Sequence, residues 1–116
     1  MMTFTNEQMF NHMIVLSGLN EKGMLGYAIA RNRRKLEAES KEYSDKRDEL
    51  LKEFGTEVEQ GRYQLVGENL SKFAEALKPY SELTAEVDVM KVPQDVFFSG
   101  SLTSSQMYAL DWMVED

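Results

Sequence analysis

The sequence predicts a mostly helical α+β protein, made of a long antiparallel helical hairpin, a small two-stranded antiparallel sheet and two shorter helices. Two capping boxes, a run of about 30 residues with a seven-residue apolar repeat, and two short strand-like segments indicate this fold class. The chain of 116 residues has the length of one ordinary domain, and no low-complexity tract or linker divides it. We therefore expect residues 1–116 to form a single domain.

The first helix is predicted over Asn6 to Leu16. Thr5 and Gln8 form a capping box, in which the hydroxyl and the amide each satisfy a free backbone donor. A broad apolar stripe at helical spacing follows, consisting of Met9, Phe10, Met13, Ile14 and Leu16. The segment 17–20 then supplies a stop.

A much longer helix is predicted from Glu21 or Lys22 to Phe54, with Gly55 as a left-handed terminator. Two interior glycines, Gly23 and Gly26, weaken its opening turns. Its apolar residues form a thin column with a seven-residue period, namely Ile29, Leu36, Tyr43 and Leu50. The matching second positions of this half-filled coiled-coil heptad are Arg33, Ser40, Arg47 and Phe54. Such a helix would be about 45 Å long, so either later elements fold back on its far half or that half meets another chain.

Two strands and a third helix are predicted in the middle of the chain. The strands are Arg62–Val66 and Glu86–Val92, and we expect them to pair with each other because an isolated strand leaves its backbone groups unsatisfied. The helix between them has a core-facing stripe of Leu70, Phe73, Leu77, Tyr80 and Leu83. Pro79 interrupts this stripe, and because the stripe continues past it we favour a kink over a break.

The last helix is predicted over Ser104 to Met113, after a second capping box between Thr103 and Gln106. Its apolar groups nearly encircle the axis, with Tyr108 and Trp112 away from Leu110. Tyrosine and tryptophan bury a large area at little entropic cost and are favoured at interfaces. Either the helix is sandwiched within its own domain, or one face docks on a partner chain.

Charge argues against general nucleic-acid binding. The net charge is −7; residues 1–58 carry nine Lys/Arg and ten Asp/Glu, whereas residues 59–116 carry four and ten. A negative chain repels phosphate backbones unless a local basic patch overrides its field. One such patch comprises Arg31, Arg33, Arg34 and Lys35. We expect these cations to pair with the glutamates that follow on the same helix. The alternative is that they contact an acid or a phosphate of a partner.

The chemical inventory indicates no enzyme, no metal site and no cofactor. Cysteine is absent and His12 is the only histidine, so neither a dyad nor a transition-metal cluster can form. No Walker loop, dinucleotide fingerprint or nucleophile elbow is present. Carboxylates such as Glu86, Asp88 and Asp111 are read as solvated surface. No stretch could span a membrane and no secretory signal precedes the first helix, so we expect a cytoplasmic or virion location.

The order of features resembles a family of small uncharacterised proteins of tailed phages and prophages. The resemblance rests on segments 10–18, 23–34 and 35–55, on Tyr63-Gln64-Leu65, and on the closing segments 98–103 and 109–113. It implies a phage or prophage origin. It assigns no activity and no functional residue.

The sequence therefore favours a non-enzymatic phage-type protein that acts through protein–protein interaction, in virion assembly, on a host factor or by self-association. The expected contact residues are Tyr108, Trp112, Tyr43, Arg47 and Leu50. A second hypothesis is an acidic inhibitor of a host nucleic-acid enzyme, such as a defence nuclease, whose basic channel the C-terminal half would occupy. Nucleic-acid binding through Arg31 to Lys35 ranks third.

Overall fold

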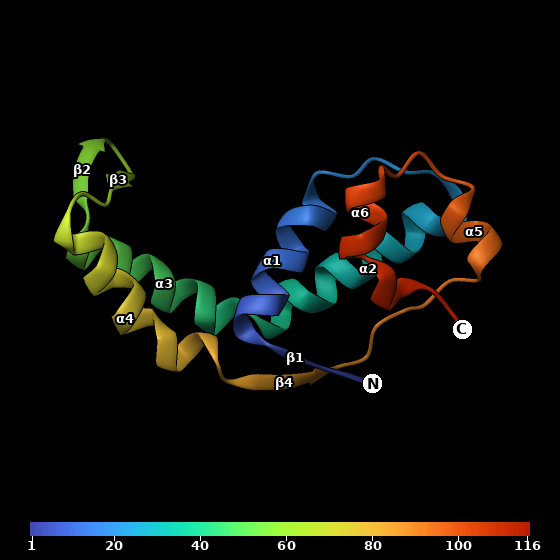
Figure 1. Ribbon diagram of the computed structural model, residues 1–116, viewed down its shortest axis with the longest axis horizontal. Coiled ribbons are helices and arrows are strands. Elements are labelled where there is room, and N and C mark those ends of the chain that lie inside the picture. Colours follow the sequence, from blue (N-terminus) through green and yellow to red (C-terminus); the bar gives the residue numbers. More distant parts are fainter.

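The computed structural model describes all residues 1–116 and confirms a mostly helical α+β fold. The helices are α1 (Asn6–Ser17), α2 (Gly23–Glu39), α3 (Lys41–Phe54), α4 (Glu68–Ser81), α5 (Gln94–Phe98) and α6 (Ser104–Ala109), followed by the 3₁₀ turn η1 (Asp111–Met113). The strands are β1 (Met2–Thr5), β2 (Thr56–Glu59), β3 (Arg62–Gln64) and β4 (Thr84–Val87). The molecule measures 47 × 28 × 21 Å, with α3 and α4 at one end and the other helices at the opposite end (Figure 1).

Both predicted capping boxes are present, at Thr5 with Gln8 and at Thr103 with Gln106. In each box the backbone N–H of the glutamine donates to the threonine hydroxyl, and the glutamine side chain accepts from the threonine N–H. These reciprocal bonds satisfy donors that would otherwise be left free at a helix start. They explain why α1 and α6 begin where the sequence predicts.

The prediction of a single long helix that ends at Phe54 is wrong. The structure divides this segment at Ser40 into α2 and α3. The Ser40 hydroxyl donates to the Leu36 carbonyl at 2.6 Å, and such a bond back to the preceding turn bends helices. Two termini also differ from prediction. Gly23 has a φ of +65° and so marks the start of α2, and Gly55 is extended rather than left-handed.

The apolar column of this segment is buried throughout and contributes to two separate cores, so Tyr43 and Leu50 are not the open contact residues that the sequence predicted. Ile29 and Leu36 lie in the larger one, with Met9 and Leu16 of α1 and the C-terminal residues. Tyr43 and Leu50 lie in the smaller one, with Phe73 and Leu77 of α4. Helix α4 therefore folds back on α3, which is the first of the two arrangements expected for the far half of the long helix.

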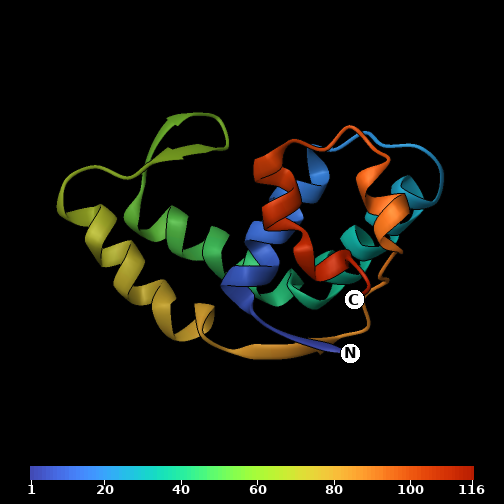
Figure 2. The same cartoon turned by 45° about the vertical axis from the view of Figure 1, so that its right-hand side comes forward.

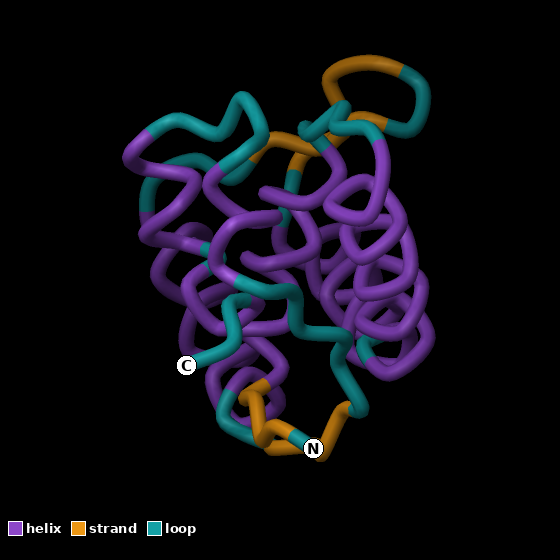
Figure 3. Tube along the Cα trace, turned by 90° about the vertical axis from the view of Figure 1, so that its right-hand side faces the viewer, coloured by secondary structure: helices purple, strands orange, loops and turns teal.

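The prediction that the two strands pair with each other is wrong. Strand β4 pairs in antiparallel fashion with β1 at the N-terminus, with Phe4 opposite Ala85, and β3 pairs with β2 in a hairpin. The hairpin lies between the end of α3 and the start of α4 (Figure 2). Every residue of β2 is exposed. Figure 3 shows the two strand pairs as separate sheets. The segments β1 and β2 were not predicted as strands, and of the predicted strand Glu86–Val92 only Glu86 and Val87 lie in β4.

Helix α4 continues through Pro79 to Ser81, so the proline does not end it. Within its predicted stripe only Phe73 and Leu77 are buried, whereas Leu70, Tyr80 and Leu83 are exposed. No helix of the chain is both long enough and apolar enough to cross a membrane.

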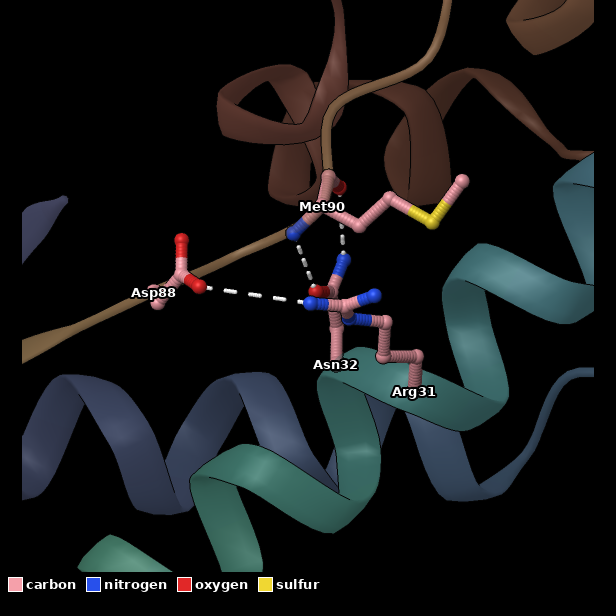
Figure 4. Close-up of polar contacts among 4 residues, drawn as sticks. All are labelled: Arg31, Asn32, Asp88 and Met90. Atoms are coloured by element: carbon pink, nitrogen blue, oxygen red, sulfur yellow. Dashed lines mark hydrogen bonds and ion pairs between the residues drawn. The ribbon is translucent and has the colours of Figure 1, made fainter.

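The side chain of Asn32 fixes the connection after β4 to the middle of α2. Its amide nitrogen donates to the Met90 carbonyl at 2.9 Å, and its carbonyl oxygen accepts from the Met90 N–H at 2.7 Å (Figure 4). Asn32 is fully buried and Met90 is partly buried, so both bonds are largely shielded from water. One side chain thus satisfies both backbone polar groups of a residue that belongs to no strand.

The last residues close the larger core. The Val92 N–H donates to the Met113 carbonyl and the Glu115 N–H donates to the Val92 carbonyl, both at 2.8 Å. The Trp112 ring packs against Phe4 and His12, with ring centroids 5.5 and 5.2 Å away. Desolvation in this aromatic cluster lowers the pKa of His12 below its ordinary value of 6.5, and the charge of Asp111 opposes the shift.

We expect Asn32→Ala to lower the free energy of unfolding by about 2–4 kcal/mol, because it leaves the N–H and C=O of Met90 without partners. Urea denaturation followed by circular dichroism measures this loss. Asn20→Ala, at an exposed position, is the matched control and should change stability by less than about 0.5 kcal/mol. Equal effects of the two substitutions would contradict the role of Asn32.

We expect His12 to make the fold less stable in mild acid. Its pKa is lower in the folded chain than in the unfolded one, so between these two values the unfolded chain binds more protons and stability falls as the pH falls below about 6.5. The loss of stability between pH 7.5 and pH 5.5 should therefore be smaller in His12→Gln than in the wild type. Carboxylates titrate in both proteins and cancel in this difference, and an equal loss in both would refute the assignment.

Candidate interaction groove

A concave surface with an apolar floor lies between α1, α3 and α4. It is an open groove of about 560 Å³. Its apolar and aromatic lining consists of Phe10, Tyr43, Leu70, Phe73, Ala74 and Leu77, and its polar lining of Glu7, Asn11, Arg47, Lys78, Ser81 and Glu82. Three different helices therefore contribute to one surface.

The floor of the groove is held by polar contacts as well as by packing. The Tyr43 hydroxyl lies 2.8 Å from the Ser81 hydroxyl, and the Ser81 hydroxyl lies 3.2 Å from the Leu77 carbonyl, to which it donates. The Phe10 and Tyr43 rings meet edge to face, with centroids 6.1 Å apart. These contacts join α3 to α4 and to α1, so the groove is preformed.

Arg47 occupies a special position in the groove. Its guanidinium carbon lies 4.8 Å from the centre of the Phe10 ring and 5.7 Å from that of Phe73. The two rings attract the cation and hold it in place. Arg47 is half-buried and belongs to none of the five ion pairs of the chain, which are Arg31–Asp88, Lys41–Asp45, Lys46–Glu49, Arg62–Glu59 and Lys78–Glu82. Its charge is therefore positioned without a carboxylate partner.

The rim of the groove carries charges of both signs. Glu7 and Glu82 lie near the junction of α1 and α4, where the Asn6 N–H donates to the Leu83 carbonyl and the Asn6 amide donates to the Tyr80 carbonyl. Lys78 and Glu82 approach to 4.0 Å on the exposed surface. Inside this rim Leu70 is 56% exposed, so the groove presents an uncovered apolar side chain.

The structure separates the five predicted contact residues. Tyr43 and Leu50 are buried in the smaller core, and Trp112 is buried in the larger one. Only Tyr108, at 83% exposure, and the half-buried Arg47 reach the surface, and their contact with a partner stays a prediction. The prediction of one helix to Met113 is wrong, because α6 ends at Ala109. The turn η1 follows and directs Trp112 inward, so Tyr108 and Trp112 do not share one surface.

The remaining polar candidates do not gather into a reactive site. His12 lies between Phe4 and Trp112, and no group of three or more His, Asp or Glu side chains is placed to hold one metal ion. The basic run 31–35 does not pair with the glutamates that follow it on the helix, contrary to expectation. Its one ion pair joins Arg31 to Asp88 at 3.9 Å.

No protein-family model, curated protein or solved structure matches the chain. The geometry of the groove is therefore the basis for its function. The sequence predicted Tyr43 and Arg47 as contact residues. It assigned Phe10 and Phe73 to apolar stripes that face the core, and it did not predict that both rings contact Arg47. The only sequence signal for this contact is that all four residues lie on stripes at helical spacing. Which stripes face each other depends on the antiparallel packing of α3 and α4, so the contact could not be predicted from spacing alone.

We expect Arg47→Gln to lower the free energy of unfolding by about 1 kcal/mol, because the interaction with two aromatic rings is lost. Arg34→Gln removes the same charge from an exposed position of α2 that contacts no ring, and it should be nearly neutral. Urea denaturation of both variants measures the difference. If Arg47→Gln is as stable as Arg34→Gln, the two rings do not hold the guanidinium.

Proposed function

We propose that this protein is not an enzyme and acts by binding another protein, and that the groove between α1, α3 and α4 receives an amphipathic helix of the partner. The carrying observation is the aromatic groove with a positioned, unpaired Arg47 at its floor and an uncovered Leu70 inside its rim. Such a surface offers apolar contact area and one directed charge. The resemblance of the sequence to phage proteins makes a virion protein or a host factor the kind of partner proposed.

A helix suits the groove better than an extended strand does. The walls are helices, and the lining provides side chains but no free strand edge that an extended peptide could extend. An amphipathic helix would place apolar side chains, three or four residues apart, against Leu70, Phe73 and Leu77.

Charge restricts the occupant further. Arg47 has no carboxylate partner in the chain, so it favours an acidic side chain on the apolar face of the bound helix. Glu7 and Glu82 favour a basic side chain where that helix passes the junction of α1 and α4. A partner helix that carries both the acidic and the basic side chain would therefore bind in only one orientation along the groove.

The chain contains no cysteine, so a single introduced cysteine gives a unique attachment site. We expect Leu70→Cys carrying a benzophenone group to cross-link a partner polypeptide when the labelled protein is irradiated in extracts of the cells that produce it. Leu83→Cys, similarly exposed but outside the groove, is the control and should not give this product.

Two variants of α4 test whether the product depends on the groove. Ala74→Glu places a charged side chain in the groove from an exposed position and should abolish cross-linking. Ser71→Glu makes a similar change on an exposed part of α4 outside the groove and should preserve it. A product of twice the chain mass would identify a second copy as the partner, which light scattering checks. No product, or one that Ala74→Glu leaves unchanged, would refute the proposal.

A further inference from the structure

A second concave surface lies on the outward face of α2, on the side away from its buried residues. Tyr27, Arg31, Arg34, Lys35 and Ala38 line an open hollow of about 340 Å³ there, the α2 hollow. Their spacing of three and four residues puts them on one face of the helix. The α2 hollow shares no residue with the groove, so a ligand of the hollow does not depend on the proposed function of the groove.

The three cations of the α2 hollow lack strong counter-charges. Arg34 and Lys35 belong to none of the ion pairs of the chain. Arg31 meets only Asp88, at 3.9 Å, and the two side chains are 40% and 58% exposed, so this pair contributes little. In a chain of net charge −7 these positive charges form a local exception, and they can attract an anion over a short range.

Arg31 lies beside the connection that Asn32 fixes. Asp88 lies two residues before Met90, whose backbone N–H and C=O both bond to the Asn32 amide. Figure 4 shows the Arg31 guanidinium beside this contact, with one nitrogen directed at Asp88.

Tyr27 adds an aromatic surface next to these charges. It lies one helical turn before Arg31 and is 56% exposed, and its ring is stacked on no other ring of the chain. Nucleobases stack on exposed aromatic rings, while neighbouring arginines and lysines bind the phosphates. The distance along α2 from Tyr27 to Lys35 is about 12 Å, which suits one or two nucleotides.

We propose that the α2 hollow binds a nucleotide, either free or within single-stranded nucleic acid. Tyr27 stacks on the base, and Arg34, Lys35 and Arg31 bind the phosphate. Asp88 competes with the phosphate for Arg31. The acidic remainder of the molecule confines the contact to this short stretch.

Fluorescence anisotropy with a labelled single-stranded oligothymidylate at low salt tests the proposal. Arg34→Gln should weaken binding about tenfold, since a charged hydrogen bond is lost, and should reduce the slope of log affinity against log salt by about 0.7. Arg33→Gln removes the same charge from the adjacent residue, which lines a different hollow with Met13 and Ile14, and should leave affinity unchanged. Tyr27→Ala should weaken binding about tenfold, and Asp88→Asn should strengthen it.

Competition distinguishes the two sources of the nucleotide. Displacement of the probe by thymidine monophosphate identifies a free nucleotide as a sufficient ligand, whereas displacement only by unlabelled oligothymidylate identifies a strand. The proposal is overturned if the probe does not bind, or if Arg33→Gln and Arg34→Gln act alike. It is also overturned if Tyr27→Ala has no effect and inorganic phosphate competes as well as the nucleotide, because the α2 hollow would then bind simple anions.

Discussion

The pair of hydrogen bonds between the Asn32 side chain and the Met90 peptide is the constraint on which the larger half of the molecule depends. A carboxamide presents a donor and an acceptor side by side, so it can replace the neighbouring strand that the Met90 peptide lacks. The contact fixes the connection after β4 on α2. On one side of it β4 can pair with β1, and on the other Val92 can reach Met113 and Glu115. A single buried polar residue in an otherwise apolar helix face thus sets the position of three chain segments.

The smaller half is organised around different contacts. Ser40 separates α2 from α3, and the apolar column then continues through Tyr43 and Leu50 against α4. Four buried residues make a small core, which Phe10 of α1 and Phe54 extend with partly buried rings. The groove exists because this core does not fill the space between the three helices. The stacking of Arg47 on Phe10 links the smaller half to α1, so any ligand of the groove would contact both halves.

The sequence predicted the elements with strong local signals and missed those that depend on distant partners. The capping boxes gave the starts of α1 and α6. The seven-residue column of Ile29, Leu36, Tyr43 and Leu50 is buried within the chain, although the sequence placed Tyr43 and Leu50 at a partner contact. Strand β1, whose partner β4 lies far along the chain, was missed, and so was β2, although its partner β3 is close in sequence. The two features that carry proposals also arise from tertiary structure: the antiparallel packing of α3 on α4 makes the groove, and the failure of residues 31–35 to pair with their neighbouring glutamates leaves the α2 hollow positive.

The pairing of β1 with β4 has a consequence for the order in which the chain can fold. Met2 needs Val87 as its partner, and the larger core is complete only when Trp112 and Met113 arrive. By contrast, α3, the β2–β3 hairpin and α4 follow one another in the chain, and their contacts, such as Tyr43 with Ser81, span shorter stretches of sequence. Local contacts form quickly and distant ones slowly, because long loops must close first. During synthesis the smaller half can therefore assemble before β1 has paired with β4. Until residues 84–87 emerge from the ribosome, β1 presents an unpaired edge, and this is the interval in which the chain is most open to aggregation or to a chaperone.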